Sequence, residues 1–483
     1  MSTPPLPAEA HARPAHMARR VAILQGLVFW LTFAAVCASA VFLGGNRPAV
    51  WVALSLAVIA LYVVQIVCDL AAPPDATDRS FLVSLAVLWA LVIAWALVQG
   101  LPAAVAGWSH PAWSAAGVAP GRITPDPAAT AQAALRMIAY GGIFWIAYRA
   151  GTDRRRARAF VSMVALWVLV TALYGLIALG AGVNPITGPS AYPGTVTSSF
   201  VNRNAYALYA GFGLLAAMAG VGLIVRRELS QLPPMMEAAP LRAIEVVITR
   251  GWVLALAAIV LAAAILLTES RGGTVASGVG LCLLIALLAY RRGATTRVLT
   301  WSIALPAMLL VAGLWVSAQV TAQEAQGLTG RLAFEDPSRD ARWSVYAAVL
   351  GAIAARPLIG HGFGAFQDGF RPFATAELGK TEWDFAHNTY LQTAFELGLP
   401  AAALMFLALG LIGLRLMRGV ATRSRGRALP ALALSALVAA GLHGLVDFSP
   451  EMPATAALLA MTLGVGAAQS NRPRRPPRPD QFT

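Results

Sequence analysis

The chain has 483 residues, of which 58% are hydrophobic and only 12% are charged, and its mean hydropathy is +0.67. A soluble domain carries about 25% charged residues, so this composition is typical of a membrane protein. The net charge of +14 does not indicate nucleic-acid binding, because the basic residues gather in short segments between apolar stretches. The three cysteines have no CxxC spacing, which argues against a disulfide framework or a zinc site.

About twelve stretches of this chain have the roughly 20 mostly apolar residues that a membrane-spanning helix needs. The first stretch is too long for a cleavable signal peptide, and others follow it. We therefore predict an all-α polytopic membrane protein, with a single integral membrane domain over residues 1–483. The predicted spans are residues 21–43, 48–69, 80–100, 131–149, 159–181, 203–225, 251–268, 272–290, 298–318, 400–417, 428–446 and 454–469.

The basic residues predict the orientation of the chain. Most of the 36 lysines and arginines fall in segments that one orientation assigns to the cytoplasm, as the positive-inside tendency requires. This orientation puts both termini in the cytoplasm, including a proline- and arginine-rich tail at residues 470–483. The long polar loop at residues 319–399 then lies outside, as do two proline- and glycine-rich loops at residues 101–130 and 182–202.

The long loop has predicted internal structure. Asp336 followed by Pro337 is typical of a helix start. The apolar residues after it recur at helical spacing and predict an amphipathic helix on the bilayer surface. Glycines alternate in the following GHGFG, which predicts a tight turn that lets backbones approach closely, and a second short helix is expected over residues 386–397. The apolar positions are Trp343, Tyr346, Ala347, Leu350, Ile353 and Ala354.

Two isolated arginines are predicted at the same depth on the outer face. Arg203 lies in SSFVNRNAYALY and Arg271 in LLTESRGGTVA, and Arg342 in the amphipathic helix can reach the same level. Arginine holds phosphate oxygens with a planar fork of donors, so the pair indicates an anion site that suits a diphosphate. The alternative is that each arginine snorkels to the interface or pairs with an acid such as Glu269. The sequence has neither a nucleotide-binding glycine motif nor HExxH, so we expect no cofactor and no metal.

His387 is the predicted catalytic residue. It lies in the polar stretch DFAHNTYLQ just outside the membrane, and a histidine can accept or donate a proton near neutral pH. Asn388, Gln392 and Glu396 share one stripe of the short helix, so His387 is expected to border a polar face. The alternative is a hydrogen-bonded structural histidine.

Two further histidines are weaker candidates. His361 lies among the glycines of the tight turn, where a structural role is favoured over a catalytic one. His443 and Asp447 are one helical turn apart at the outer end of the eleventh predicted span. They can form a second polar pair on the same face, or they can cap the end of that helix.

Four sequence blocks in order resemble one known family. They are SSFVNRNAYA, LLTESRGG, DARWSVYAAVLGAIAARPLIGHGFGAF and AHNTYLQTAFELGLPA. Over roughly residues 195–405 the chain resembles the O-antigen ligase and polymerase family of bacterial inner-membrane proteins. The predicted multispan topology agrees with this resemblance over the whole chain. His361 departs from the family pattern, in which the corresponding turn more often has a small or apolar residue.

The resemblance implies a glycosyltransferase on the periplasmic face of the inner membrane. Such enzymes move a glycan from an undecaprenyl-diphosphate carrier to a glycan or glycolipid acceptor (lipid A-core or another carrier-linked glycan) or to a protein, without a nucleotide sugar or a metal. By this resemblance Arg203 and Arg271 hold the diphosphate, His387 activates the acceptor hydroxyl, and Asp447 matches a further acidic position. We predict His387 as catalytic, and as substrate-binding Arg203, Arg271, Arg342, Asn388 and Asp447.

A second class of function stays open. A multispan secondary transporter or a flippase of a lipid-linked glycan would also suit about twelve spans. The sequence shows no matching pair of broken helices in its two halves, and Arg136 is the main candidate for a charge within a span. Transport sites usually need more such charges, so glycan transfer is favoured.

Overall fold

Every regular element in the described part of the chain is a helix. The computed structural model describes residues 9–103, 105, 107–189, 191–229, 239–289, 337–375, 378–380, 382–423 and 426–471. Within these ranges the β structure amounts to one isolated bridge between Pro102 and Arg122. The predicted all-α class is therefore confirmed.

Eight helical segments of the described residues are long and apolar enough to cross a membrane. They coincide with eight of the predicted spans and make the chain a polytopic membrane protein. They are Arg19–Val41 within α1 (Glu9–Val41), α2 (Pro48–Ala71), α3 (Ala76–Gln99), α6 (Arg154–Ala181), α7 (Arg203–Leu229), Leu241–Leu267 (from α8, Ala239–Val246, to α9, Trp252–Leu267), α10 (Arg271–Ala289) and α15 (Leu399–Thr422).

The other four predicted spans differ from these eight. Residues 131–149 form part of α5 (Pro127–Gly151), which is not among the eight and packs against α2, α3 and α17 inside the bundle. The eleventh and twelfth correspond to α16 (Ala428–His443) and α17 (Pro453–Ala468), each of 16 residues and therefore shorter than an ordinary span. Residues 298–318 lie outside the described residues, as do residues 319–336 of the long loop and residues 472–483 of the tail.

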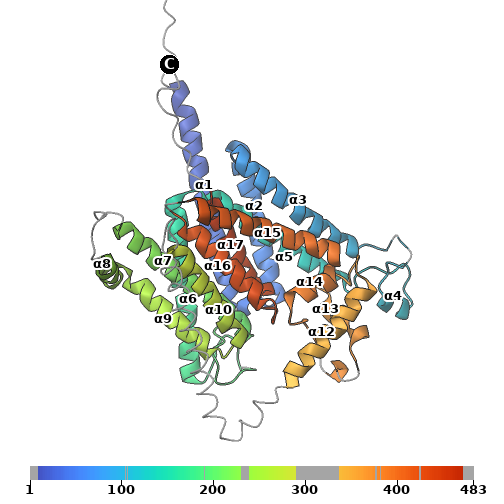
Figure 1. The fold of residues 1–483 in the computed structure, drawn as a ribbon. Helices are drawn as coiled ribbons and strands as arrows, with labels where there is room; N and C mark the ends of the chain where they lie inside the picture. Colours follow the sequence, from blue (N-terminus) through green and yellow to red (C-terminus); the bar gives the residue numbers. More distant parts are fainter. Residues whose placement is uncertain are drawn as a thin grey trace, which may run out of the picture.

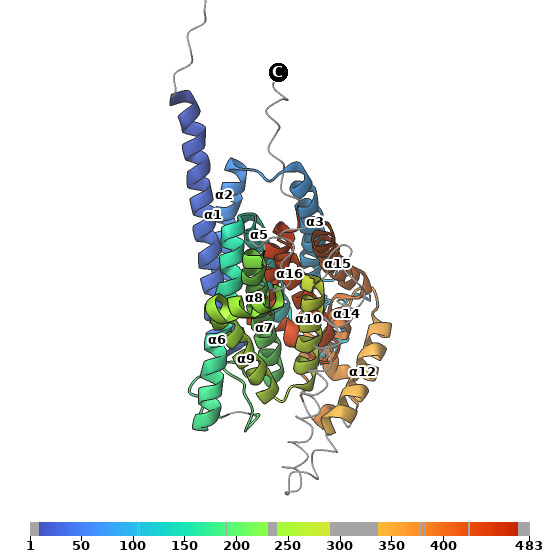
Figure 2. The ribbon, with the colours of Figure 1, turned by 60° about the vertical axis from the view of Figure 1, so that its left-hand side comes forward.

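The helices form one bundle with α16 and α17 inside it (Figures 1 and 2). These two helices pack against each other, α16 also against α7 and α10, and α17 also against α5. Small residues allow the close packing, as is usual between helices in a membrane. A Cβ atom at Gly464 of α17 would lie only 2.5 Å from the backbone oxygen of Phe144 on α5.

The described part of the long loop has its own apolar core at the edge of the bundle, where α12 lies in both views of the ribbon. Phenylalanine rings and valines from three helices fill this core, so the loop is a packed unit rather than an irregular strap. The helices are α12 (Pro337–Ala355), α13 (Phe366–Phe370) and α14 (Thr389–Leu397), and the core residues include Val345, Val349, Phe366, Phe370 and Phe395.

The predicted amphipathic helix is α12, but its apolar residues divide between two faces. Trp343 is 68% exposed and Leu350 is 54% exposed, so they point away from the loop core. Val345 and Val349 on the other face are fully buried. The prediction of one apolar face was therefore incomplete, because the loop supplies a core of its own that covers a second face. The predicted cap Asp336 lies outside the described residues.

The GHGFG segment is a tight turn, as predicted. Gly360, Gly362 and Gly364 all have positive φ angles, of 69°, 114° and 75°. A Cβ atom at Gly362 would lie 2.3 Å from the hydroxyl oxygen of Thr124, which lies in the outer loop before α5. Glycine is therefore required here both for the backbone conformation and for the close approach.

Candidate active site

A helix was predicted over residues 386–397, which would include His387. The structure differs: His387 lies just before α14, outside the helix. The helix begins at Thr389 because Asn388 is its cap: the Asn388 side-chain oxygen accepts hydrogen bonds from the backbone N–H groups of Tyr390 and Leu391, both at 3.0 Å. His387 has a φ angle of +54°, a left-handed conformation that is uncommon outside glycine. Non-glycine residues in this conformation concentrate at functional sites.

The His387 ring packs between aromatic side chains and is partly exposed. Its centroid lies 5.0 Å from that of Phe448 and 6.0 Å from that of Trp383, both in edge-to-face contacts. The side chain keeps 23% of its surface exposed. The hydroxyl of Tyr346 on α12 donates a 2.8 Å hydrogen bond to the backbone oxygen of His387. The ring is thus held in place while part of it remains accessible.

Asp447 is the acidic partner of His387. Its Oδ2 atom lies 3.7 Å from His387 Nδ1, slightly beyond hydrogen-bond distance, and its side chain is only 2% exposed. Asn204 donates a 2.9 Å hydrogen bond to the same oxygen, and the backbone and hydroxyl of Ser449 donate to Oδ1. Burial alone would raise the pKa of Asp447. The surrounding donors and the imidazoles of His387 and His443 outweigh burial and lower that pKa.

The two predicted anion-binding arginines are the first residues of α7 and α10. Arg203 Nη1 lies 3.4 Å from Glu269 Oε2, and its guanidinium lies over the ring of Tyr192 at 5.1 Å from the centroid. Arg271 is exposed and has no ion-pair or hydrogen-bond partner among the described residues. Ser270 caps α10 before it, through a 3.1 Å hydrogen bond from a backbone N–H to its hydroxyl. Helix starts carry a partial positive charge, which adds to that of the arginines.

The fold brings these arginines to the same place as His387. The residue after the first arginine is Asn204, whose amide holds Asp447, the partner of His387. The residue after the second is Gly272, where a Cβ atom would lie 3.4 Å from the Nε2 atom of His443. His443 is one turn before Asp447 and is buried at the end of α16. The starts of α7, α10 and α14 therefore converge on the end of α16.

The last two predicted substrate-binding residues have different settings. Arg342 is partly exposed in the first turns of α12, one turn before Tyr346. Burial raises the pKa of Tyr346, and the positive charge of Arg342 acts in the opposite direction. Asn388 has backbone partners at both ends of its amide, because its Nδ2 atom also donates a 2.9 Å hydrogen bond to the backbone oxygen of Leu445. Its side chain is thus committed to holding the start of α14 against the end of α16.

His361 is buried in the loop core, away from solvent. Its ring stacks on Phe395 with the centroids 4.4 Å apart, and its Nδ1 atom lies 3.4 Å from Nε2 of His110 in the first outer loop. Both side chains are fully buried. Burial lowers the pKa of His361 to about 4 and that of His110 to about 3, so both are neutral near pH 7. The pair joins two outer loops, which agrees with the structural alternative predicted for His361.

A buried polar cluster behind His387 was not predicted as a unit. The Nε2 atom of Gln392 donates to Glu396 Oε1 at 3.2 Å and to Glu451 Oε2 at 2.9 Å. Burial raises the pKa of Glu396 to about 7 and that of Glu451 to about 8. Of the predicted stripe of Asn388, Gln392 and Glu396, the last two belong to this cluster, whereas Asn388 caps α14 and bonds to Leu445. Glu451 lies in the stretch DFSPEMP, and the residues around it in the sequence did not indicate a contact with Gln392.

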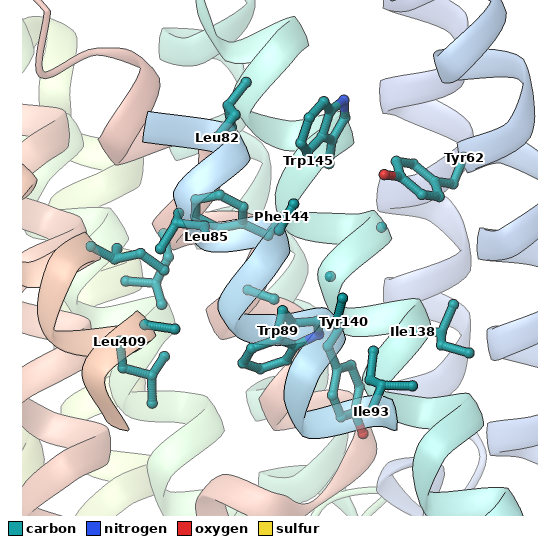
Figure 3. A pocket seen from close by; sticks show the side chains of 18 residues that line it. Tyr62, Leu82, Leu85, Trp89, Ile93, Ile138, Tyr140, Phe144, Trp145 and Leu409 are labelled. Atoms are coloured by element: carbon teal, nitrogen blue, oxygen red, sulfur yellow. The ribbon is translucent and has the colours of Figure 1, made fainter. Parts of the chain in front are cut away.

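An apolar pocket of about 320 Å³ lies elsewhere in the bundle, between α2, α3, α5, α15 and α17. Figure 3 shows the rings of Tyr62 and Trp145 at one end and those of Trp89 and Tyr140 at the other. None of its lining residues is a predicted site residue. Within the described ranges, no three His, Cys, Asp or Glu side chains gather as a metal site would require.

Residues 256–406 match the model of the protein family described as O-antigen ligase. This segment is an O-antigen ligase family domain. The O-antigen ligase domain runs from α9 to the start of α15 and confirms the family that the sequence blocks indicated. It contains Arg271, Arg342, His387 and Asn388, whereas Arg203 and Asp447 lie outside it. No curated protein matches the chain.

Proposed function

We propose that this chain transfers a glycan from an undecaprenyl-diphosphate carrier to an acceptor hydroxyl at the site of His387. The main support is that the pair of His387 and Asp447 lies where α7 and α10 begin, each with an arginine. A glycosyl diphosphate is already activated, so the protein must stabilise the charge on the leaving group and activate the acceptor. The site has one set of residues suited to each task.

Arg203 and Arg271 are proposed to hold the diphosphate. Arg203 is 30% exposed and Glu269 is 49% exposed, so their 3.4 Å ion pair is worth no more than about 1 kcal/mol. Arg203 can therefore leave Glu269 for a phosphate at little cost. Arg271 is exposed and unpaired within the described residues. Two guanidinium groups would stabilise the charge that develops on the departing diphosphate.

His387 is proposed to take the proton of the acceptor hydroxyl. Its Nδ1 atom faces Asp447, which leaves Nε2 for the substrate. As the hydroxyl oxygen bonds to the anomeric carbon, the bond from that carbon to the diphosphate breaks and the proton passes to Nε2. Direct displacement inverts the anomeric configuration. Such a base contributes roughly 10²–10⁴-fold to a rate, and the Asp447 carboxylate stabilises the imidazolium that forms.

Arg342 and Asn388 have lesser roles in this proposal. Arg342 is proposed to contact the donor or the acceptor from the α12 side, because it is partly exposed and one turn from the Tyr346 that bonds to His387. Asn388 is proposed to act through its cap and its bond to Leu445, which hold the residue after His387 in place. This revises the predicted substrate contact for Asn388, since neither end of its amide is free.

The proposed setting is a bacterial inner membrane with this site on the periplasmic face. The long loop at residues 319–399 would then be periplasmic, and both termini, with the tail at 470–483, cytoplasmic. The acceptor is lipid A-core, another carrier-linked glycan or a protein, because all three use the same donor chemistry. The alternative is a transporter or flippase, which would move the lipid-linked glycan without forming a new bond.

The purified protein tests the proposal when it is reconstituted with undecaprenyl-diphosphate-linked glycan and each class of acceptor, with the product identified by mass spectrometry. We expect a glycosylated acceptor from the wild type. We expect loss of transfer in His387→Asn, which tolerates the left-handed backbone, and in Arg271→Ala, with folding retained. Transfer by His387→Asn at the wild-type rate would refute the role of the base.

A further inference from the structure

The backbone of residues 386–389 is held by hydrogen bonds to three other parts of the chain. Tyr346 bonds to the oxygen of His387, and the backbone N–H of Thr389 donates to the oxygen of Gly444 at 2.8 Å. The N–H of Ala386 donates to Gln392 Oε1 at 3.0 Å. A left-handed histidine persists only where its surroundings over-determine the backbone. The groups that hold Ala386 and its neighbours therefore also fix the His387 ring.

The orientation of the Gln392 amide follows from its partners. Its oxygen faces the N–H of Ala386, and its nitrogen lies between oxygens of Glu396 and Glu451. The reversed amide would set two donors against each other and an oxygen between two acceptors. Only the observed orientation satisfies all three contacts. The two glutamates thus decide which end of Gln392 meets the backbone next to His387.

We propose that Gln392 and Glu451 are positioning residues, which hold the Ala386–His387 backbone and so aim the His387 ring at the acceptor hydroxyl. The proposal rests on the proposed function of His387. Gln392 is 4% exposed, and Glu451 Oε1 is buried with no hydrogen-bond partner among the described residues. Among the described residues, neither side chain has a hydrogen bond to the His387 side chain, so both act through the backbone.

The ionisation of the cluster agrees with this role. Burial raises the pKa of Glu451 to about 8, and the neighbouring charge of Glu396 raises it further in the same direction. A protonated Glu451 places no second buried charge beside Glu396, and its carbonyl oxygen still accepts from Gln392. Glu396 also accepts a 2.7 Å hydrogen bond from the backbone N–H of Gly364, which ties the cluster to the glycine turn.

The first test is Gln392→Leu, measured as kcat and donor KM in the reconstituted transfer reaction, with the melting temperature as the check on folding. It leaves the N–H of Ala386 without its partner and lets His387 shift. Because a misplacement of about 1 Å can cost about 100-fold, we expect kcat to fall by roughly 10- to 100-fold with donor KM within about twofold. An unchanged kcat in the folded variant would overturn the proposal.

The second test exchanges the hydrogen-bond donor and acceptor between positions 392 and 451. Gln392→Glu sets a carboxylate against Glu396 and Glu451 and should lower kcat. The double variant Gln392→Glu/Glu451→Gln restores an amide opposite a carboxylate and should recover most of it. A folded double variant as slow as Gln392→Glu alone would count against the proposal, even if Gln392→Leu does not fold.

The third test separates this inference from the proposed function. In a His387→Asn background, Gln392→Leu should cause no further loss of the residual rate, since it acts through a ring that is no longer there. A full additional loss would show that Gln392 acts independently of His387. If His387→Asn itself keeps the wild-type rate, the proposed function fails; if it is impaired while Gln392 variants keep their kcat, this inference alone fails.

Discussion

The partnership of Asp447 with His387 leads to a prediction for Asp447→Asn, which removes the negative charge but keeps the shape of the side chain. The two groups are 3.7 Å apart, so their attraction in the protonated state of His387 is about 1 kcal/mol at the dielectric constant of water and about 4.5 kcal/mol at an effective value of 20. Asp447 is 2% exposed and His387 23%, which places the pair between these limits. We take about 2 kcal/mol, which corresponds to roughly a 30-fold loss of kcat.

The assay is the reconstituted transfer reaction at saturating donor, with kcat and donor KM measured separately. The matched control is Ser449→Ala, which removes a hydrogen bond to the other carboxylate oxygen of Asp447 but leaves its charge beside His387. We expect the control to lose far less activity than Asp447→Asn, and donor KM to change little in either variant. Equal losses in the two variants would refute the electrostatic reasoning and leave only a packing role for Asp447.

Three further predictions concern the arginines, the buried histidines and the topology. Glu269→Gln should lower donor KM several-fold with little change in melting temperature, because it frees Arg203 from a weak competing pair; an unchanged or higher KM would contradict the role of Arg203. Stability should fall as pH drops from about 6.5 to 4, by roughly 1.4 kcal/mol per pH unit for each histidine, because His361 and His110 stay neutral when folded but take up protons when unfolded. In His361→Gln, the melting temperature should depend less steeply on pH across this window. An equally steep dependence would argue against the role of His361 in the pH response. A cysteine at the exposed position of Arg371 should react with an impermeant thiol reagent in intact cells; labelling only after lysis would reverse the proposed orientation.

Most of the fold could be predicted from the sequence, since long apolar stretches are a strong signal of membrane helices. Three of the predicted spans, in α5, α16 and α17, are not among the eight long apolar helices, and α16 and α17 have only 16 residues each. Only one apolar face of α12 was predicted. Its second face packs against a core formed by residues 20 to 50 positions later in the chain, such as Phe366 and Phe395. Helical spacing identifies an apolar face but not what covers it.

The candidate site shows a similar division. Arg203 and Arg271 stood out because polar residues near lipid are costly without a task. His387 stood out because a histidine in a polar stretch outside the membrane can exchange a proton near neutral pH. Asn204 and Glu451 did not stand out, because the role of each depends on a contact with a residue more than fifty positions away in the sequence. The left-handed backbone of His387 also could not be read from its neighbours, because it is imposed by tertiary hydrogen bonds.

Glycan transfer through His387 is tested most directly by following the label of a radiolabelled undecaprenyl-diphosphate glycan in vesicles that contain the acceptor. We expect the label to become covalently bound to the acceptor with the wild-type protein, and to remain on the carrier with His387→Asn. Label that crosses the bilayer still attached to its carrier, with no new glycosidic bond, would contradict transfer and favour a flippase. Equal transfer by the two proteins would instead contradict the role of His387.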